Sequence, residues 1–131
     1  MFLLDTNVCS AIVRRSPSTL FDRYAGLRAG EAAISAIVYA EIQYGRTKRP
    51  LGRVRETIVA RVLATLEVLP WTQVAAEHYA DIRAGLEREG TPIGAMDMLI
   101  AAHARSADAT LVTLNHREFA RVPGLRVESW S

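Results

Sequence analysis

The sequence predicts an α/β domain with a mainly parallel central sheet. Apolar runs of three or four residues, such as residues 2–4 and 110–113, alternate with longer segments whose apolar residues recur at helical spacing. Strands that alternate with helices are joined by crossover connections, which leave the strands parallel. The 131 residues are the usual length of one domain, and we expect residues 1–131 to form a single unit, because no linker or repeat interrupts them.

Residues 2–4 are the first predicted strand, and Asp5 follows at its carboxyl end. Thr6 or Asn7 is expected to cap the next helix, because short polar side chains bond to the free backbone N–H groups of a helix start. Asp5 therefore stands where a buried strand meets a helix, which is where open α/β sheets bind their ligands.

Helix-start and helix-stop residues divide the rest of the chain. Ser16 is expected to cap a helix with Pro17 in its first turn, and this helix extends to about residue 28. Ser35 is expected to cap a helix that ends near Gly45, before a basic loop over 46–50. The other expected elements are strands over 32–35, 67–69, 110–113 and 125–128, helices over about 52–65, 74–88 and 95–105, a loop over 89–94, and a turn or short helix over 115–120.

Composition excludes several classes of protein. A formal net charge of +2 does not suit a protein that coats DNA, and no apolar run approaches the length of a membrane span. The single cysteine, Cys9, excludes an internal disulfide framework and is typical of a reducing compartment. Residues 1–5 lack the basic start of a signal peptide, so we expect a cytoplasmic protein that does not contact the membrane.

Three of the fourteen acidic residues stand in unusual surroundings. Asp5 ends an apolar strand, Glu41 has apolar residues or glycine at its helical neighbours, and Asp97 lies within the apolar run 95–102. A carboxylate that faces an apolar interior costs several kcal/mol unless a cation pairs with it. Neither Glu41 nor Asp97 has a lysine or arginine three or four residues away, so the cation must come from elsewhere.

A divalent metal ion meets the needs of all three acids at once. Oxygen-only ligands suit Mg²⁺, with Mn²⁺ as the alternative ion, whereas the lack of a His or Cys cluster argues against zinc. Each acid also has a purely structural explanation. Asp5 can cap a helix, Glu41 can pair with a distant arginine, and Asp97 can stabilise the start of its helix through the dipole. All three explanations must hold together for there to be no site.

Four segments, in order, resemble the motifs of one family. Residues 4–7, LDTN, resemble the opening motif of PIN domains, and residues 35–45, SAIVYAEIQYG, resemble the second motif. Residues 91–104, TPIGAMDMLIAAHA, are similar to the VapC form of the third motif, and residues 111–130 are similar to the VapC C-terminus. The chain is thus identified as a PIN-domain ribonuclease that resembles the VapC toxins of VapBC toxin–antitoxin pairs.

The resemblance implies a PIN fold with helices around a parallel sheet, and a Mg²⁺ site formed by Asp5, Glu41 and Asp97. It further implies endoribonuclease activity on tRNA or another structured RNA, and inhibition by a VapB antitoxin. A homodimer is expected, and a larger toxin–antitoxin assembly that reaches operator DNA through the antitoxin. The antitoxin is expected to cover apolar surface near Val8, Ile12 and Tyr39.

The position after the last core strand departs from the family pattern. Many PIN domains have a fourth acid there, but this chain has the neutral Asn115, followed three residues later by Glu118. Either residue is a candidate to complete the site. Asn115 is favoured here, because it follows its strand by two residues, in the same kind of position that Asp5 holds. With Asn115 in place, a second metal ion is expected to bind weakly, since an amide offsets less of the ion's charge.

Other side chains are candidates for supporting roles. Thr6, Asn7 and Thr113 can hold the carboxylates by hydrogen bonds, or can serve as ordinary caps and strand ends. Arg46, Lys48 and Arg49, in the expected basic loop, are candidates for contact with RNA phosphates. The histidines at positions 78, 103 and 116 are expected to be surface or core residues and not general bases.

Rival functions fit the sequence less well. A haloacid-dehalogenase-like phosphatase needs an acid where Asn7 stands, and a phosphotransfer receiver needs a late lysine, whereas the only lysine is Lys48. A nuclease that acts on flapped DNA needs clamping elements for which 131 residues leave little room. A non-catalytic PIN-like module that binds RNA or protein stays open, because the position of Asn115 is neutral.

Overall fold

Five short strands form one sheet in the order β3–β2–β1–β4–β5, and every neighbouring pair is parallel. The computed structural model describes residues 1–130. Leu3 of the central strand pairs with Ala33 on one side and Leu111 on the other. The predicted α/β class and parallel sheet are therefore confirmed.

Each strand is followed by helix except the last. The elements are β1 (Phe2–Leu4), α1 (Thr6–Arg14), α2 (Ser18–Ala25), β2 (Ala32–Ser35), α3 (Ala36–Lys48), α4 (Arg53–Ala64), β3 (Glu67–Leu69), α5 (Gln73–Arg88), α6 (Ala95–Ser106), β4 (Thr110–Val112), α7 (His116–Phe119) and β5 (Arg126–Glu128).

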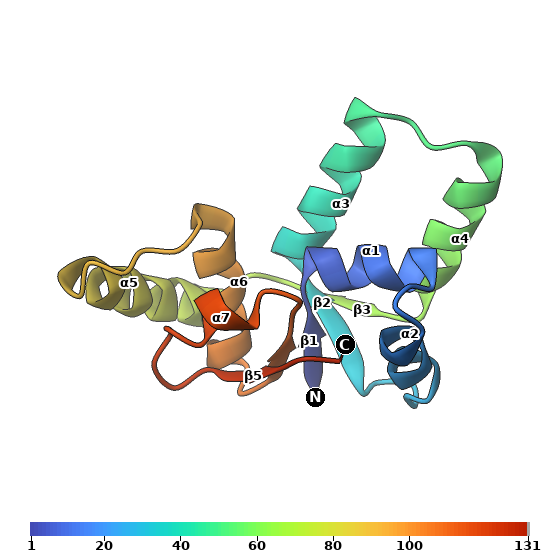
Figure 1. Cartoon of the computed structure of the whole chain (residues 1–131). Coiled ribbons are helices and arrows are strands. Elements are labelled where there is room, and N and C mark those ends of the chain that lie inside the picture. Colours follow the sequence, from blue (N-terminus) through green and yellow to red (C-terminus); the bar gives the residue numbers. More distant parts are fainter. Residues whose placement is uncertain (131) are drawn as a thin grey trace.

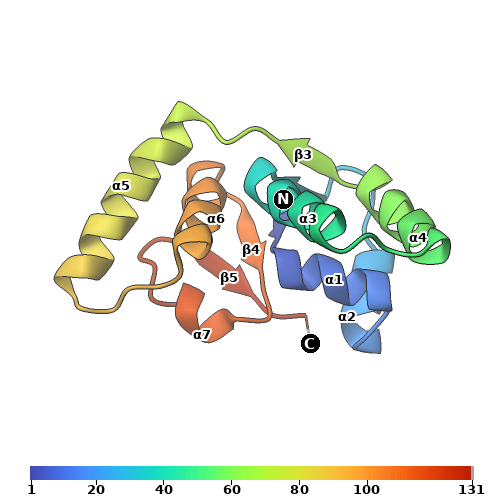
Figure 2. The same ribbon diagram turned by 90° about the horizontal axis from the view of Figure 1, so that it is seen from above.

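The helices form two groups around the sheet. Viewed from above, α5 and α6 pair on one side of the molecule, whereas α1 to α4 gather on the other (Figure 2). Helices α3 and α4 rise together away from the body, beyond the carboxyl ends of the strands (Figure 1). We call these two helices and their connection, residues 36–64, the α3–α4 arm. Because the strands are parallel, their carboxyl ends, α1 and the base of this arm all meet at one edge.

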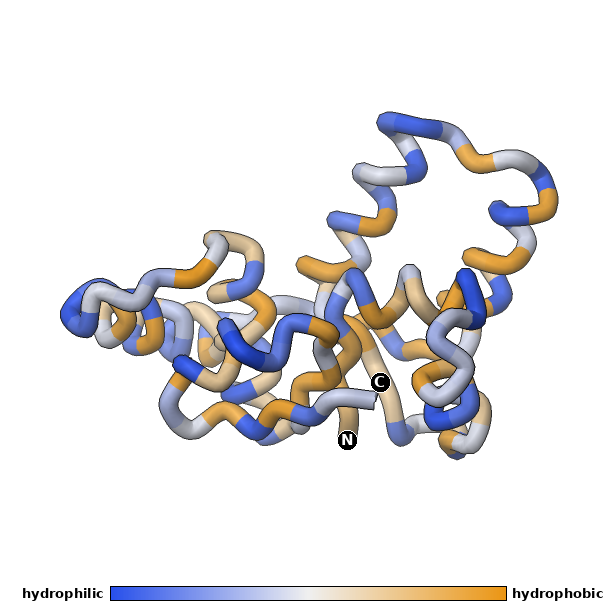
Figure 3. The backbone as a smooth tube through the Cα atoms, in the orientation of Figure 1, coloured by the Kyte–Doolittle hydropathy of each residue, from blue (hydrophilic) through white to orange (hydrophobic). Residues whose placement is uncertain are grey.

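The core lies around the central strands. Leu3, Leu4 and Leu111 are completely buried, and they pack against apolar residues of α1 and α6. The central strand β1 is hydrophobic along its length, whereas the far end of α3 is hydrophilic (Figure 3). In residues 1–130, no helix is both long enough and apolar enough to cross a membrane.

The caps of the first two helices differ from the prediction. Asp5, and not Thr6 or Asn7, caps α1, since its side chain accepts the backbone N–H of Val8. The second helix begins at Ser18 with Pro17 in the extended cap position, so Ser16 lies outside it and makes no cap. This helix ends at Ala25, three residues before the expected position.

The expected basic loop over 46–50 is mostly helix. Helix α3 continues through Gly45 to Lys48, where the prediction had ended it. The Arg46 guanidinium bonds to Gln43 one turn earlier and to Glu56 of α4, at 2.7 and 2.6 Å, so tertiary contacts extend the helix past its glycine. A glycine costs a helix only about 1 kcal/mol, which such contacts offset.

Candidate active site

Asp5 is fixed at the carboxyl end of the central strand. Because Leu4 pairs with Val112, the next residues, Asp5 and Thr113, also lie side by side. Asp5 Oδ1 accepts the backbone N–H of Val8 at 2.9 Å, and Asp5 Oδ2 accepts the hydroxyl of Thr113. Thr113 is fully buried and accepts in turn from the backbone N–H of Asn115, at 2.9 Å. The carboxylate therefore has one defined orientation.

The surroundings of Asp5 oppose its charge. Burial is the main cause that raises its pKa, and the hydrogen bonds from Thr113 and Val8 act in the opposite direction. The negative charge of Glu41 raises the pKa of Asp5 further. A cation at this position would remove both penalties.

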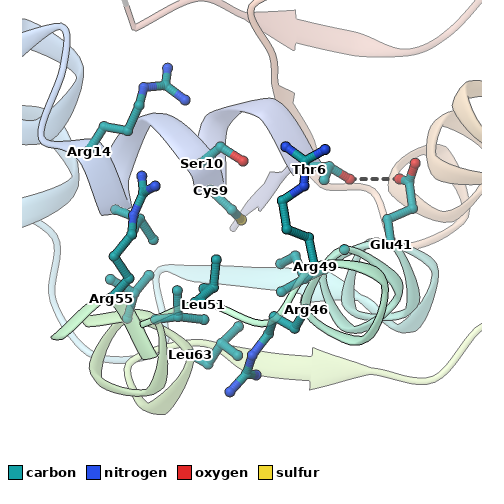
Figure 4. A pocket seen from close by; sticks show the side chains of 15 residues that line it. Thr6, Cys9, Ser10, Arg14, Glu41, Arg46, Arg49, Leu51, Arg55 and Leu63 are labelled. Carbon is teal, nitrogen blue, oxygen red and sulfur yellow. Dashed lines mark hydrogen bonds between the residues drawn. The ribbon is translucent and has the colours of Figure 1, made fainter. Parts of the chain in front are cut away.

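Glu41 reaches the same edge from α3. The hydroxyl of Thr6, the first residue of α1, donates to Glu41 Oε1 at 2.6 Å (Figure 4). Glu41 is partly buried, and the described residues include no arginine or lysine paired with it. This hydrogen bond joins the start of α1 to the α3–α4 arm.

Asp97 lies in the first turn of α6, where an acid is favoured by the helix dipole. Burial raises the pKa of Asp97, and the charges of Glu118, Asp5 and Glu41 raise it further. A Cβ atom on Gly94 would lie 3.3 Å from Asp97 Oδ2, so glycine leaves room for this carboxylate. Within residues 1–130 no salt bridge neutralises Asp97.

Four carboxylates thus act on one another at one edge of the sheet without a paired cation among the described residues. They are not closed into a cage, because no three Asp, Glu, His or Cys side chains of residues 1–130 stand close enough together to enclose a metal ion. The donors on offer are all oxygens, which is the set that Mg²⁺ and Mn²⁺ prefer. Their chemistry fits a hard divalent cation, and small side-chain movements would be needed to bind it.

The fourth position remains between Asn115 and Glu118. Asn115 directly precedes α7 and donates its backbone N–H to Thr113, while its side chain caps nothing. Glu118, in α7, is the charge that does most to raise the pKa of Asp97. This electrostatic effect on Asp97 favours Glu118, whereas position along the chain favours Asn115.

A groove of about 440 Å³ leads away from the Thr6–Glu41 bond, between α1, α3 and α4 (Figure 4). Apolar side chains, including Val13, Ile42 and Leu63, line much of it. Arg14, Arg49 and Arg55 also line it, and these three arginines have no acidic partner among the described residues.

The three cations expected in a basic loop have different surroundings. Arg46 is in a salt bridge with Glu56, and the ammonium of Lys48 lies 5.7 Å from the centre of the Tyr44 ring. Of these three cations, only Arg49 lines the groove without an acidic partner among the described residues. Sequence reasoning missed Arg14 and Arg55, because nothing in the local sequence shows that α1 and α4 face each other across this groove. Asn7 is exposed, and its backbone N–H lowers the pKa of Asp5.

Comparisons with known proteins identify the family. The PIN-domain family model matches residues 2–125. The chain is 38% identical to the tRNA(fMet)-specific endonuclease VapC of Shigella flexneri, over 99% of this chain and 98% of that one. It is 40% identical to the protein of the same name from Salmonella typhimurium, over 98% and 97% of the two chains.

Solved structures give the same result. The chain superposes with a TM-score of 0.90 and 35% identity on a chain of VapBC2 from Rickettsia felis bound to a promoter DNA fragment, covering 99% of this chain and 98% of that one. It superposes with a TM-score of 0.89 and 39% identity on a chain of DNA-bound VapBC from Salmonella typhimurium, covering 99% and 98%. The chain therefore belongs to the PIN-domain family and, within it, to the VapC ribonucleases.

Proposed function

We propose that this chain is the toxin of a VapBC pair, a Mg²⁺-dependent endoribonuclease that cleaves tRNA and is inhibited by a VapB antitoxin. The observation that carries the proposal is the set of unpaired carboxylates, Asp5, Glu41 and Asp97, at the carboxyl edge of a PIN-domain sheet. Structural explanations for the single residues do not account for this convergence, because the charge of Glu41 raises the pKa of both Asp5 and Asp97.

Asp5, Glu41 and Asp97 are the proposed metal ligands, with Glu118 or Asn115 as the fourth, and Mn²⁺ as the alternative to Mg²⁺. A bound divalent ion supplies charge that neutralises the phosphodiester and lowers the pKa of water. Thr113 and the Val8 N–H hold Asp5 in place, and Thr6 holds Glu41, so little side-chain entropy remains to be lost. Water is the nucleophile, so the products are a 5′-phosphate and a 3′-hydroxyl.

The substrate proposal rests on the relatives. Two proteins 38% and 40% identical to this chain carry the name tRNA(fMet)-specific endonuclease. We infer that initiator tRNA is the first RNA to test, and that elongator methionine tRNA is its matched control. The two tRNAs accept the same amino acid and differ in sequence and shape.

The antitoxin is proposed to occupy the groove between α1, α3 and α4. The helices near Val8, Ile12 and Tyr39 were expected to supply apolar surface for it. Val8 and Ile12 themselves are 0% and 1% exposed and belong to the core, whereas Tyr39 is partly buried. The groove offers partly buried apolar side chains, including Val13, Ile42 and Leu63, and its unpaired arginines suit a segment that also carries acidic residues. Where the groove ends at Glu41, an arginine of the antitoxin would neutralise the carboxylates.

The proposed assembly of this chain with an antitoxin and operator DNA also rests on the relatives. The structures with TM-scores of 0.90 and 0.89 contain VapB-type partners and DNA, so we propose that operator DNA is reached through the antitoxin. A homodimer of this chain and a cytoplasmic location complete the proposal.

The deciding experiment is cleavage of the two methionine tRNAs by purified protein, with the products mapped at nucleotide level. We expect cleavage of initiator tRNA that EDTA abolishes and Mg²⁺ restores. Equal cleavage in EDTA would contradict the metal mechanism. Binding of RNA without cleavage in Mg²⁺ or Mn²⁺ would favour the alternative, a non-catalytic PIN-like module.

A further inference from the structure

A buried hydrogen bond links the two helices that carry Glu41 and Asp97. His103 of α6 and Ser35, which precedes α3, lie with Nδ1 and Oγ 2.7 Å apart, and they are 4% and 0% exposed. Ser35 Oγ also accepts the backbone N–H of Ile37 at 3.1 Å, so the same hydroxyl caps α3. The two residues are 68 positions apart in the sequence.

The bond lies at equal distances along the two helices from the two carboxylates. Glu41 follows Ser35 by six residues, and Asp97 precedes His103 by six residues. At 1.5 Å of rise per residue, each carboxylate lies about 9 Å along its helix from the hydrogen bond. Over that length a tilt of about 6° displaces a side chain by about 1 Å, and such a displacement can cost about a hundredfold in rate.

The apolar packing of α3 is confined to its first two turns. Val38 is fully buried, and Ile37, Tyr39 and Ile42 are partly buried against the core, in a helix of thirteen residues all of which are described. The Thr6–Glu41 bond also lies in this part, and farther along the Arg46–Glu56 salt bridge joins α3 to α4, which rises with it. Figure 1 shows this arm projecting from the body.

Burying the polar side chains of His103 and Ser35 costs free energy, and packing alone does not explain why they are there. His103 stands in a helix whose other inward residues, Ile100, Ala101 and Ala104, are apolar and buried. Burial lowers the pKa of His103, so its ring is neutral at pH 7 and needs a hydrogen-bond partner. An apolar side chain there would need none.

We propose that His103 is a positioning residue, which sets the spacing of Glu41 and Asp97 by anchoring the base of α3 to α6 through Ser35. The proposal rests on the proposed function, because it assigns the spacing of these carboxylates to metal binding. The role of the pair in orienting the helix can be measured separately.

Leucine and asparagine have nearly the same shape and make a matched pair at position 103. His103→Asn keeps a polar atom where Nδ1 stands, whereas His103→Leu removes it. Thr72→Ala is the control for stability, because Thr72 caps α5 in the way that Ser35 caps α3, through a bond from Ala75. Helix α5 carries none of the proposed ligands. If His103→Leu does not fold, Ser35→Ala and its matched control Ser35→Thr take the place of the two His103 variants.

Two measurements on the full chain decide the proposal. The first is the distance between spin labels on Thr47→Cys in α3 and Ala84→Cys in α5, in metal-free buffer and in a Cys9→Ala background. Both labelled positions are exposed. The second is Mn²⁺ affinity, from the electron paramagnetic resonance signal of the free ion.

We expect His103→Leu to broaden the distance distribution and to weaken Mn²⁺ binding about tenfold, the usual effect of removing a group that orients a ligand. His103→Asn and Thr72→Ala should leave both near wild type. An unchanged distribution in His103→Leu would overturn the proposal, as would equal changes in all three variants. If the wild type binds no Mn²⁺, the proposed metal site fails, and the label distance still decides whether His103 orients α3.

Discussion

The sheet edge and the α3–α4 arm hold their carboxylates in different ways. Asp5 is 6% exposed, ends the central strand, and is bonded at both oxygens, to Val8 and Thr113. Glu41 is on a helix with one buried residue and has one hydrogen bond, from Thr6. The sheet therefore builds one half of the site through its register, whereas the other half depends on the packing at the base of α3 and on a few side-chain bonds. Substitutions at the sheet edge and in the α3–α4 arm should therefore differ in their effects on stability and on activity.

The largest effect is expected at Asp97, which belongs to the rigid body. Asp97→Asn keeps the shape of the side chain and removes its charge, so we expect cleavage of initiator tRNA to fall at least about a hundredfold. The measurement is single-turnover cleavage at saturating Mg²⁺. Activity within a few-fold of wild type would exclude Asp97 from the metal site.

The pH dependence of the same variant checks the cause. The folded-state pKa values of Asp5 and Asp97 lie above their ordinary value of 3.8, so the folded protein binds more protons than the unfolded chain. The contribution of these two carboxylates to the stability of the metal-free wild type should therefore rise as pH falls from 7 through these raised values toward 3.8. Thermal unfolding in EDTA should show a flatter pH dependence for Asp97→Asn.

At Asp5, alanine and asparagine should separate stability from activity. Asp5→Ala removes the cap of α1 and leaves the buried hydroxyl of Thr113 without its acceptor, which should cost about 2 kcal/mol. Asp5→Asn keeps an oxygen for the Val8 N–H and should cost less. Both should lose cleavage, and chemical denaturation measures the difference between them.

Local pattern was enough to predict the sheet and to single out two of the candidate acids. Apolar runs identified the strands, and Asp5 and Asp97 were recognisable because they interrupt apolar sequence. The features that the sequence did not predict depend on contacts between distant segments of the chain. The extension of α3 past Gly45 rests on the Arg46–Glu56 bridge, and the groove arginines are brought together by packing of three helices.

One helix cap and one hydrogen-bonded pair were also missed in the sequence. An aspartate at a strand end can serve as a ligand and as a helix cap at once, and Asp5 does cap α1, so Thr6 is free to bond to Glu41. Ser35 was correctly predicted as a cap, but its bond to His103 joins residues 68 positions apart. The spacing of apolar residues along a sequence does not predict a contact between residues so far apart.

A smaller effect is expected when the arm loses its bond to the sheet edge. Thr6→Val keeps the shape of the side chain and removes the hydroxyl that holds Glu41. We expect the Mg²⁺ concentration for half-maximal cleavage to rise about tenfold, since groups that orient ligands usually contribute tenfold to a hundredfold in affinity. The free energy of unfolding should change by under about 1 kcal/mol, because the lost bond is only partly buried. A Mg²⁺ titration with an unchanged midpoint would show that the arm needs no such bond.

The smallest effect concerns the fourth position, where α7 adds to the sheet edge. Glu118 raises the pKa of Asp97 more than any other charge does, so we now expect Glu118→Gln to raise the Mg²⁺ midpoint about threefold, as the loss of a distant or water-mediated ligand would. Excess Mg²⁺ should restore most of the activity. Asn115→Asp adds a charge next to Thr113, and if Asn115 holds the fourth place instead, this variant should tighten the midpoint while Glu118→Gln leaves it unchanged. The two titrations separate the cases because the midpoints move in opposite directions. Midpoints unchanged in both variants would mean that Asp5, Glu41 and Asp97 complete the site without α7.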